Sequence, residues 1–107
     1  MTLFSQMSKK QLQQEIERLI EAEDTARRQG LLSQASIYRQ QKNMARSYLV
    51  DPDSIEQGAE YEAEDETSPF IVSYINGVMA WGSWKSDKQL IALPISVLKK
   101  KNSPHHG

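Results

Sequence analysis

The densest group of side chains that could do chemistry is a run of carboxylates beginning at residue 60. Clustered carboxylates can bind a divalent cation or act as a general acid and base. In this run the glutamates alternate with Tyr61 and Ala63, so on a strand they would share one solvent-facing side and repel one another. No loop with the spacing of a calcium site is present. We therefore interpret the run as a solvated strand face. It consists of Glu60, Glu62, Glu64, Asp65 and Glu66.

The sequence offers no arrangement of nucleophile and base. His105 and His106 lie at the C-terminal end, where no predicted element would hold an imidazole in place. Cysteine is absent, which excludes disulfides, thiolate metal sites and cysteine nucleophiles. Gly77 and Gly82 precede no helix, so neither belongs to a phosphate-binding loop. We predict that the protein is not an enzyme and has no metal or cofactor.

Basic side chains concentrate in the first half of the chain. Residues 1–50 contain eight Lys or Arg against five Asp or Glu, whereas residues 51–98 contain two against nine. If two helices of the first half pack antiparallel, four cations would form a basic strip that could contact phosphates. The alternative is an ordinary charged helix surface, which the net charge of -1 favours. The candidate strip consists of Arg28, Arg39, Lys42 and Arg46.

The strongest structural signal is the Asn76-Gly77 pair between two runs of β-branched and aromatic residues. This pattern predicts a β-hairpin with Asn76 and Gly77 as its loop. Tyr74 would then lie opposite Met79, and Val72 opposite Trp81. One face would carry Phe70, Val72, Tyr74, Met79 and Trp81, and the other small residues around Ser73, Ala80 and Gly82, which suit a close backbone approach.

Apolar side chains on both faces of a hairpin require an explanation. One face could fill a core while the other is covered by the helices, because aromatic residues at strand spacing are usually buried. Alternatively, part of the aromatic face stays exposed and binds a peptide or stacks on bases. The candidate partner-binding residues are Phe70, Tyr74, Met79, Trp81 and Trp84.

Two amphipathic helices are predicted to precede this hairpin. Ser8 and Gln11 have the spacing of a capping box, and Gly30 suits the position after a helix C-terminus. The first helix should therefore span residues 8–29. A second apolar stripe begins at Leu31 or Leu32 and ends before Asp51-Pro52. Because the link between them is short, we expect an antiparallel helical hairpin.

The second half is predicted to be an antiparallel β domain. Residues 60–64 read as an edge strand protected by charge, residues 90–93 as a further strand, and residues 95–98 as a helical turn or a fifth strand. Several short strands in close succession favour a small barrel. We predict an α+β protein with a helical hairpin (1–52) packed on a β-barrel (53–98), followed by a basic flexible tail (99–107).

Six segments of the chain carry a resemblance to a known family. They are the capping start at Ser8, Gly30-Leu31, Met44–Leu49 before Asp51-Pro52, Gly58–Tyr61, Ser73–Gly82 and Ala92–Leu98. Together they resemble the YfhH-like proteins, a family of small uncharacterised bacterial proteins. The resemblance extends from about residue 5 to residue 98 and implies an N-terminal helical hairpin followed by an SH3-like barrel. It implies a bacterial cytosol but no activity, catalytic residue or cofactor.

These patterns lead to two functional hypotheses. The first is a non-enzymatic interaction module that binds an unidentified protein partner through the aromatic face or a groove beside the helices, with a homodimer as a variant. The second is a nucleic-acid-associated protein with its basic helices on phosphates. No segment has the length of a membrane span or the pattern of a signal peptide, so we expect a cytoplasmic protein that does not enter membranes.

Overall fold

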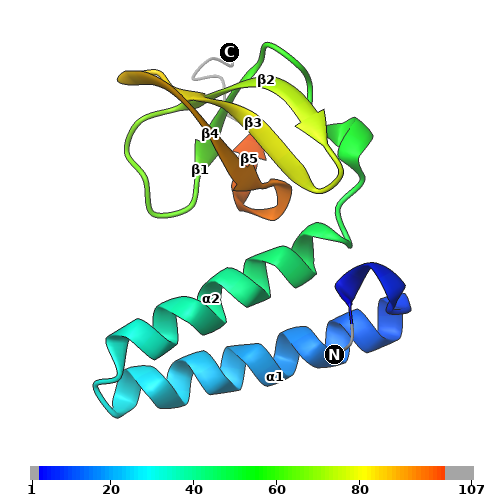
Figure 1. Cartoon of the computed structure of the whole chain (residues 1–107), viewed down its shortest axis with the longest axis vertical. Helices are drawn as coiled ribbons and strands as arrows, with labels where there is room; N and C mark the ends of the chain where they lie inside the picture. Colours follow the sequence, from blue (N-terminus) through cyan, green and yellow to red (C-terminus); the bar gives the residue numbers. More distant parts are fainter. Residues whose placement is uncertain (1–2, 101–107) are drawn as a thin grey trace, which may run out of the picture. The chain divides into compact units, whose positions relative to one another are not determined.

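The computed structural model describes residues 3–100, which divide into two compact units between Val50 and Asp51 (Figure 1). The boundary predicted from the sequence falls after residue 52, two residues further along the chain. The predicted basic tail begins too early, because Lys99 and Lys100 belong to a strand. Residues 101–107, the remainder of that predicted tail, lie outside the described residues. Neither described helix has the length and apolar character of a membrane-spanning segment.

The first unit begins with a short 3-10 helix, η1 (Phe4–Gln6), and the α-helix α1 (Lys9–Arg28). The predicted capping box is confirmed. The Ser8 Oγ accepts a hydrogen bond from the Gln11 backbone N at 3.2 Å, and the Gln11 Oε1 accepts one from the Ser8 backbone N at 2.8 Å. Gly30 follows the helix with a φ of 74°, a left-handed conformation that glycine adopts without strain.

The second helix, α2 (Leu32–Ser47), returns alongside α1 and completes the predicted helical hairpin (Figure 1). Leu12 and Ile16 of α1 form a buried cluster with Ala45 of α2, and Phe4 and Met7 pack against it. The buried residues of α2 are small or polar. They are Ala35, Asn43, Ala45 and Ser47. The stripe predicted for this helix also included Tyr38, Met44 and Leu49, which are not buried.

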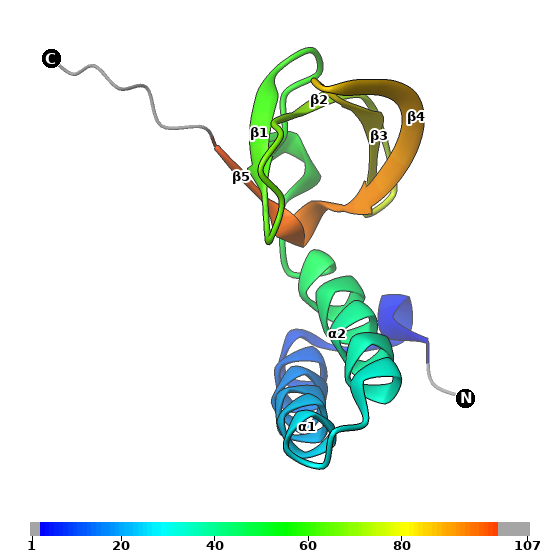
Figure 2. The ribbon, with the colours of Figure 1, turned by 90° about the vertical axis from the view of Figure 1, so that its left-hand side faces the viewer.

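The second unit contains the 3-10 helix η2 (Pro52–Ser54) and a five-stranded antiparallel sheet in the order β4-β3-β2-β1-β5. Another 3-10 helix, η3 (Ile95–Val97), connects the last two strands. Figure 2 shows that the sheet is strongly curved, so its concave face can enclose a core. The strands are β1 (Glu60–Ala63), β2 (Phe70–Asn76), β3 (Met79–Trp84), β4 (Asp87–Pro94) and β5 (Leu98–Lys100).

The predicted α+β class is correct, but closure of the sheet into a barrel is not confirmed. Strands β4 and β5 lie at opposite ends of the strand order and do not pair with each other. The alternation within β1 is confirmed, since Tyr61 and Ala63 are buried and Glu62 is exposed. The prediction that β1 is an edge strand is wrong, because β5 pairs along its other side. The packing of the helical hairpin on the β domain stays a prediction.

The predicted turn of the β2–β3 hairpin is displaced by one residue, so Tyr74 pairs with Trp81 rather than with Met79. Asn76 pairs with Met79, so the two turn residues are Gly77 and Val78. Gly77 has a φ of 63°, while Asn76 does not have a positive φ. A turn with left-handed backbone only at its first central residue is of type II′, which favours glycine there, whereas Asn-Gly as the turn would require a positive φ at both residues.

A β-bulge next to Ser73 then divides the predicted aromatic face. The register shifts between Val72 and Tyr74, which adds one residue to β2 relative to β3. Phe70 and Val72 therefore lie in the core, each with 0% exposure. After the bulge, Ile75 pairs with the buried Ala80, and Tyr74 points to the convex, outer side of the sheet.

Candidate interaction surface

The outer side of the sheet carries an exposed aromatic pair. Tyr74 of β2 lies directly opposite Trp81 of β3, and their rings stack with centroids 6.0 Å apart and an interplanar angle of 8°. Tyr74 is 42% exposed and Trp81 is half-buried. Stacked rings at this separation stabilise each other by about 1 kcal/mol beyond the area that they bury. The stacking therefore keeps both rings in a defined position on the surface.

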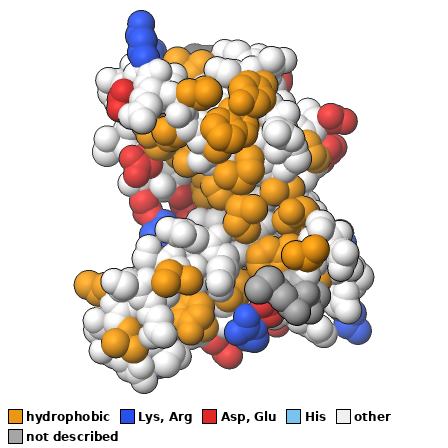
Figure 3. Space-filling model, viewed as in Figure 1, with side chains coloured by type: hydrophobic (Ala, Val, Ile, Leu, Met, Phe, Trp, Pro, Cys, Tyr) orange, Lys and Arg blue, Asp and Glu red, His pale blue; other side chains and the backbone are white. Residues whose placement is uncertain are grey.

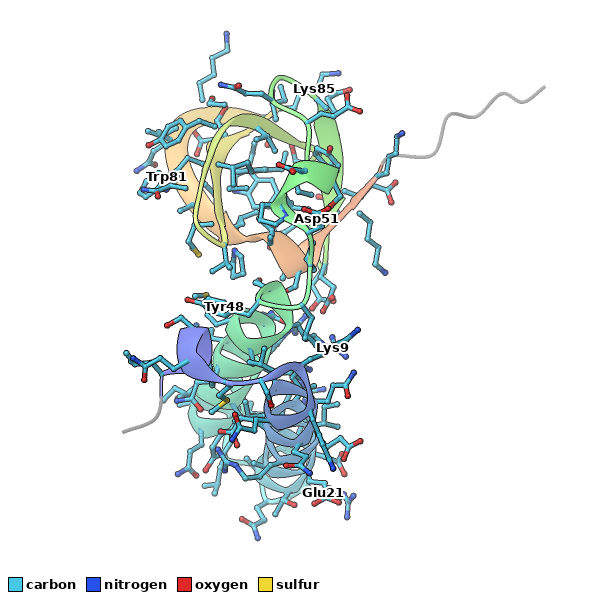
Figure 4. All side chains as sticks on the ribbon, turned by 90° about the vertical axis from the view of Figure 1, so that its right-hand side faces the viewer. Lys9, Glu21, Tyr48, Asp51, Trp81 and Lys85 are labelled. Atoms are coloured by element: carbon cyan, nitrogen blue, oxygen red, sulfur yellow. The ribbon has the colours of Figure 1, made fainter. Side chains whose placement is uncertain are left out.

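Further apolar side chains extend this pair across the sheet. Met79 lies opposite Pro94 of β4, and Trp81 lies opposite Ala92. All four side chains are half-buried. We call this surface the outer strip and define it as Tyr74, Met79, Trp81, Ala92 and Pro94 (Figure 3). Figure 4 shows the Trp81 side chain on the outside of the curved sheet.

Two of the five predicted partner-binding residues do not belong to the outer strip. Phe70 is fully buried, so it cannot contact a partner. Trp84 packs on Phe70 in an edge-to-face arrangement, with ring centroids 5.3 Å apart and an interplanar angle of 72°. For Phe70 the cause is the bulge, because it places residues before and after Ser73 on opposite sides. Trp84 lies three residues after Trp81 on β3, so simple alternation along the strand places it on the inner side. Tyr74, Met79 and Trp81 remain at the surface.

Sequence reasoning missed the contribution of β4 to the outer strip. Ala92 and Pro94 were assigned to a strand and its end, without a cross-strand partner. Pro94 lacks a backbone N–H, and its place opposite Met79 shows that the paired strand tolerates it there. The alternation of Ala92 and Pro94 with the inward Leu93 was the signal that could have placed them on one face.

The four residues of the predicted basic strip do not form a surface of free cations. Arg28 forms an ion pair with Asp24 on its own helix. Lys42 of α2 contacts Glu23 of α1, with 2.7 Å between Nζ and Oε1, and its side chain is only 14% exposed. Arg39 and Arg46 are half-buried. The strip fails because the packing of the two helices turns Lys42 toward a carboxylate rather than toward solvent.

Glu23 is therefore the centre of a buried ion-pair network. It also accepts a hydrogen bond from Arg27 at 2.6 Å, and its side chain is 9% exposed. A more exposed pair on α1 joins Arg18 and Glu15, and its hydrogen bonds hold the pKa of the Glu15 carboxyl below its usual value. Within residues 3–100, no three His, Cys, Asp or Glu side chains are grouped closely enough to hold a metal ion.

We expect Lys42→Met to destabilise the helical unit by about 2 kcal/mol, because the buried Glu23 carboxylate would keep only Arg27 as a partner. Arg28→Met removes an exposed pair and should change stability by less than about 0.5 kcal/mol. Urea unfolding followed by circular dichroism measures both. Equal losses for the two variants would contradict a stabilising role of the interhelical pair.

The two units together define a small α+β protein, in which a helical hairpin precedes a curved antiparallel sheet that carries a stacked Tyr–Trp pair on its outer side. The chain belongs to the family described as "Protein of unknown function (DUF1811)", whose family model matches residues 2–99. It is similar to "Uncharacterized protein YfhH" of Bacillus subtilis (strain 168), with 37% identity over 99 residues. The alignment covers 92% of this chain and 95% of that relative. The resemblance to the YfhH-like family is thus confirmed.

Proposed function

We propose that the protein is a non-enzymatic interaction module whose outer strip binds a segment of a partner protein. The observation that carries this proposal is the stacked Tyr74–Trp81 pair on the solvent side of the sheet. Tyrosine, tryptophan and methionine are enriched at the centres of protein interfaces, where they provide a large contact area at low conformational cost. The outer strip contains one of each.

The charge around the outer strip favours a basic or amphipathic segment. Residues 51–100 contain nine Asp or Glu against four Lys. Glu60 lies on the outer side of β1 opposite Ile71, and an ion pair with Lys85, with 3.1 Å between Nζ and Oε1, offsets its charge. The negative charge therefore comes from the unit as a whole. Complementary charge raises the rate of association and selects against acidic competitors. A protein segment with apolar residues flanked by Lys or Arg would match these properties.

The finer fold assignment, an SH3-like barrel, also belongs to this proposal. The strand order β4-β3-β2-β1-β5, the strong curvature and the 3-10 helix before β5 support it. Small β domains of this size often bind ligands on their surface rather than in an enclosed cavity. The cytoplasmic location implied by the resemblance is part of the same proposal.

An affinity capture from native bacterial cytosol tests the proposal. The bait is the full chain, and the test variant is the double substitution Tyr74→Ser and Trp81→Ser. Loss of central aromatic contacts costs about 2 kcal/mol or more, so affinity for a captured partner should fall about 30-fold. The matched control is Ile20→Ser, which removes an exposed apolar residue of α1 in the helical unit. A partner retained equally by all three baits contradicts binding through the outer strip.

Nucleic-acid binding is the second candidate, and the exposed aromatic pair is again the observation that favours it. Aromatic side chains on small β domains stack on the bases of single strands. The pairing of Arg28 and Lys42 with carboxylates lowers the positive charge available for phosphates. An oligonucleotide should then bind at about 50 mM salt and dissociate as the salt concentration rises. Captured material that resists nuclease but requires Trp81 would favour the protein partner.

A further inference from the structure

The helix α2 has an outward face without any charged residue. Lys42 points toward α1, where it contacts Glu23. Arg39 lies three residues before Lys42, and Arg46 lies four residues after it, so all three are on the same side of α2. These are the only charged residues of the helix. The opposite side carries only uncharged side chains: Ser33, Ile37, Gln40, Gln41, Met44 and, just after the helix, Tyr48.

This uncharged face is also exposed and partly apolar. Ile37 is 52% exposed and Tyr48 is 38% exposed, with the half-buried Met44 between them. Ile37, Met44 and Tyr48 are separated by seven and four residues, the spacing of a single stripe along a helix. Of the nine large hydrophobic residues that are exposed between residues 3 and 100, seven lie in the helical unit. Figure 3 shows hydrophobic and uncharged side chains over α2.

Such a face is unusual for a helix that contacts only water. The solvent side of an amphipathic helix normally carries charged residues, which favour hydration and solubility. The centres of protein interfaces show the opposite composition, with few charges and with more tyrosine and methionine. The Phe4 ring packs edge-on against Tyr48 at 6.4 Å between centroids, which orients the tyrosine at one end of the stripe.

We propose that α2 is a self-association surface, on which a second copy of this chain packs its own α2 in an antiparallel arrangement. A face without charge offers no electrostatic attraction to an oppositely charged partner, but it meets its own copy without repulsion. Most homodimers have twofold symmetry, which requires one patch to complement itself. The midpoint between Ile37 and Tyr48 lies between Gln41 and Met44. An antiparallel pair centred there places Ile37 against Tyr48 of the second copy, with both Gln41 side chains near the axis.

The test measures the mass of the full chain by light scattering over a concentration series. We expect a reversible monomer–dimer equilibrium in the wild type. Gln41→Lys and Gln41→Glu each place two like charges near the axis and should raise the dissociation constant about tenfold or more. Gln41 is exposed, so neither substitution should affect folding. An equimolar mixture of the two variants should restore the dimer, because opposite charges would then meet.

The matched control is Leu90→Lys, which introduces the same charge at a residue of β4 that is 53% exposed. It should leave the equilibrium unchanged. A wild type that remains monomeric at about 1 mM overturns the proposal. So does a dimer that persists in both Gln41 variants, or one that dissociates in the Leu90 variant. A dimer that the mixture fails to restore overturns the antiparallel arrangement.

Discussion

The substitution Gly82→Ala should destabilise the sheet unit by about 3 kcal/mol or more, because the protein has no space for a side chain there. A Cβ atom on Gly82 would lie 1.9 Å from the Ile71 carbonyl oxygen and 3.1 Å from the Val72 Cα. These atoms belong to the backbone of the neighbouring strand, so relief requires that β2 and β3 separate. Gly82 pairs with Val72, directly before the bulge of β2. Urea unfolding, followed by the near-ultraviolet circular dichroism of the sheet's aromatic residues, measures the loss.

Gly77→Ala is the matched control for this result. No heavy atom lies within 4 Å of a Cβ at Gly77, so its only cost comes from the φ of 63°. A left-handed backbone costs a non-glycine residue about 1 kcal/mol. Gly82→Ala should therefore lose clearly more stability than Gly77→Ala. If the two variants were equally stable, the close approach of the strands at Gly82 would not exist in solution.

The substitution Phe70→Ala should cost about 4 kcal/mol, because it empties the centre of the sheet unit. Phe70 has 0% exposure, and its ring contacts Trp84 edge-on. The surrounding residues relax only partly into the space left by the ring, so a cavity remains. The free-energy cost of this cavity adds to the lost transfer free energy of the side chain. Thermal and urea unfolding measure the loss, and a shift of the tryptophan emission would report the changed surroundings of Trp84.

Tyr74→Ala provides the comparison on the other side of the same strand. Tyr74 is 42% exposed and loses mainly its stacking on Trp81, which is worth about 1 kcal/mol. The predicted hairpin register places Phe70 and Tyr74 on one face, whereas the bulge separates them. Similar losses for the two variants would contradict the division of β2 by the bulge.

The sequence predicted the helical hairpin well because its signals are local. The capping box of Ser8 and Gln11 and the glycine after the helix depend on residues within one turn of each other. The alternation in β1 likewise depends only on the pleat of a single strand. Interactions of this range are encoded in neighbouring residues, so they can be identified without knowledge of the tertiary structure.

The candidate site was predicted only in part because it depends on pairing between strands. The aromatic residues of the hairpin were identified, but Phe70 and Trp84 were included among the candidate partner-binding residues. One additional residue at Ser73 reverses the direction of the side chains that follow it in β2, which separates Phe70 from Tyr74. No local sequence pattern indicates such a bulge. The basic strip failed for a related reason, since the partner of Lys42 lies 19 residues away on the other helix.

The sequence by itself determined the element types, the helix start at Ser8 and the presence of a hairpin at Gly77, because these follow from backbone preferences and local hydrogen bonds. Only the tertiary structure decided the register of that hairpin, the open order of the sheet and the burial of Lys42 against Glu23. Each of these depends on contacts between residues distant in the chain. Their free energies come from packing and pairing that only the folded protein brings together.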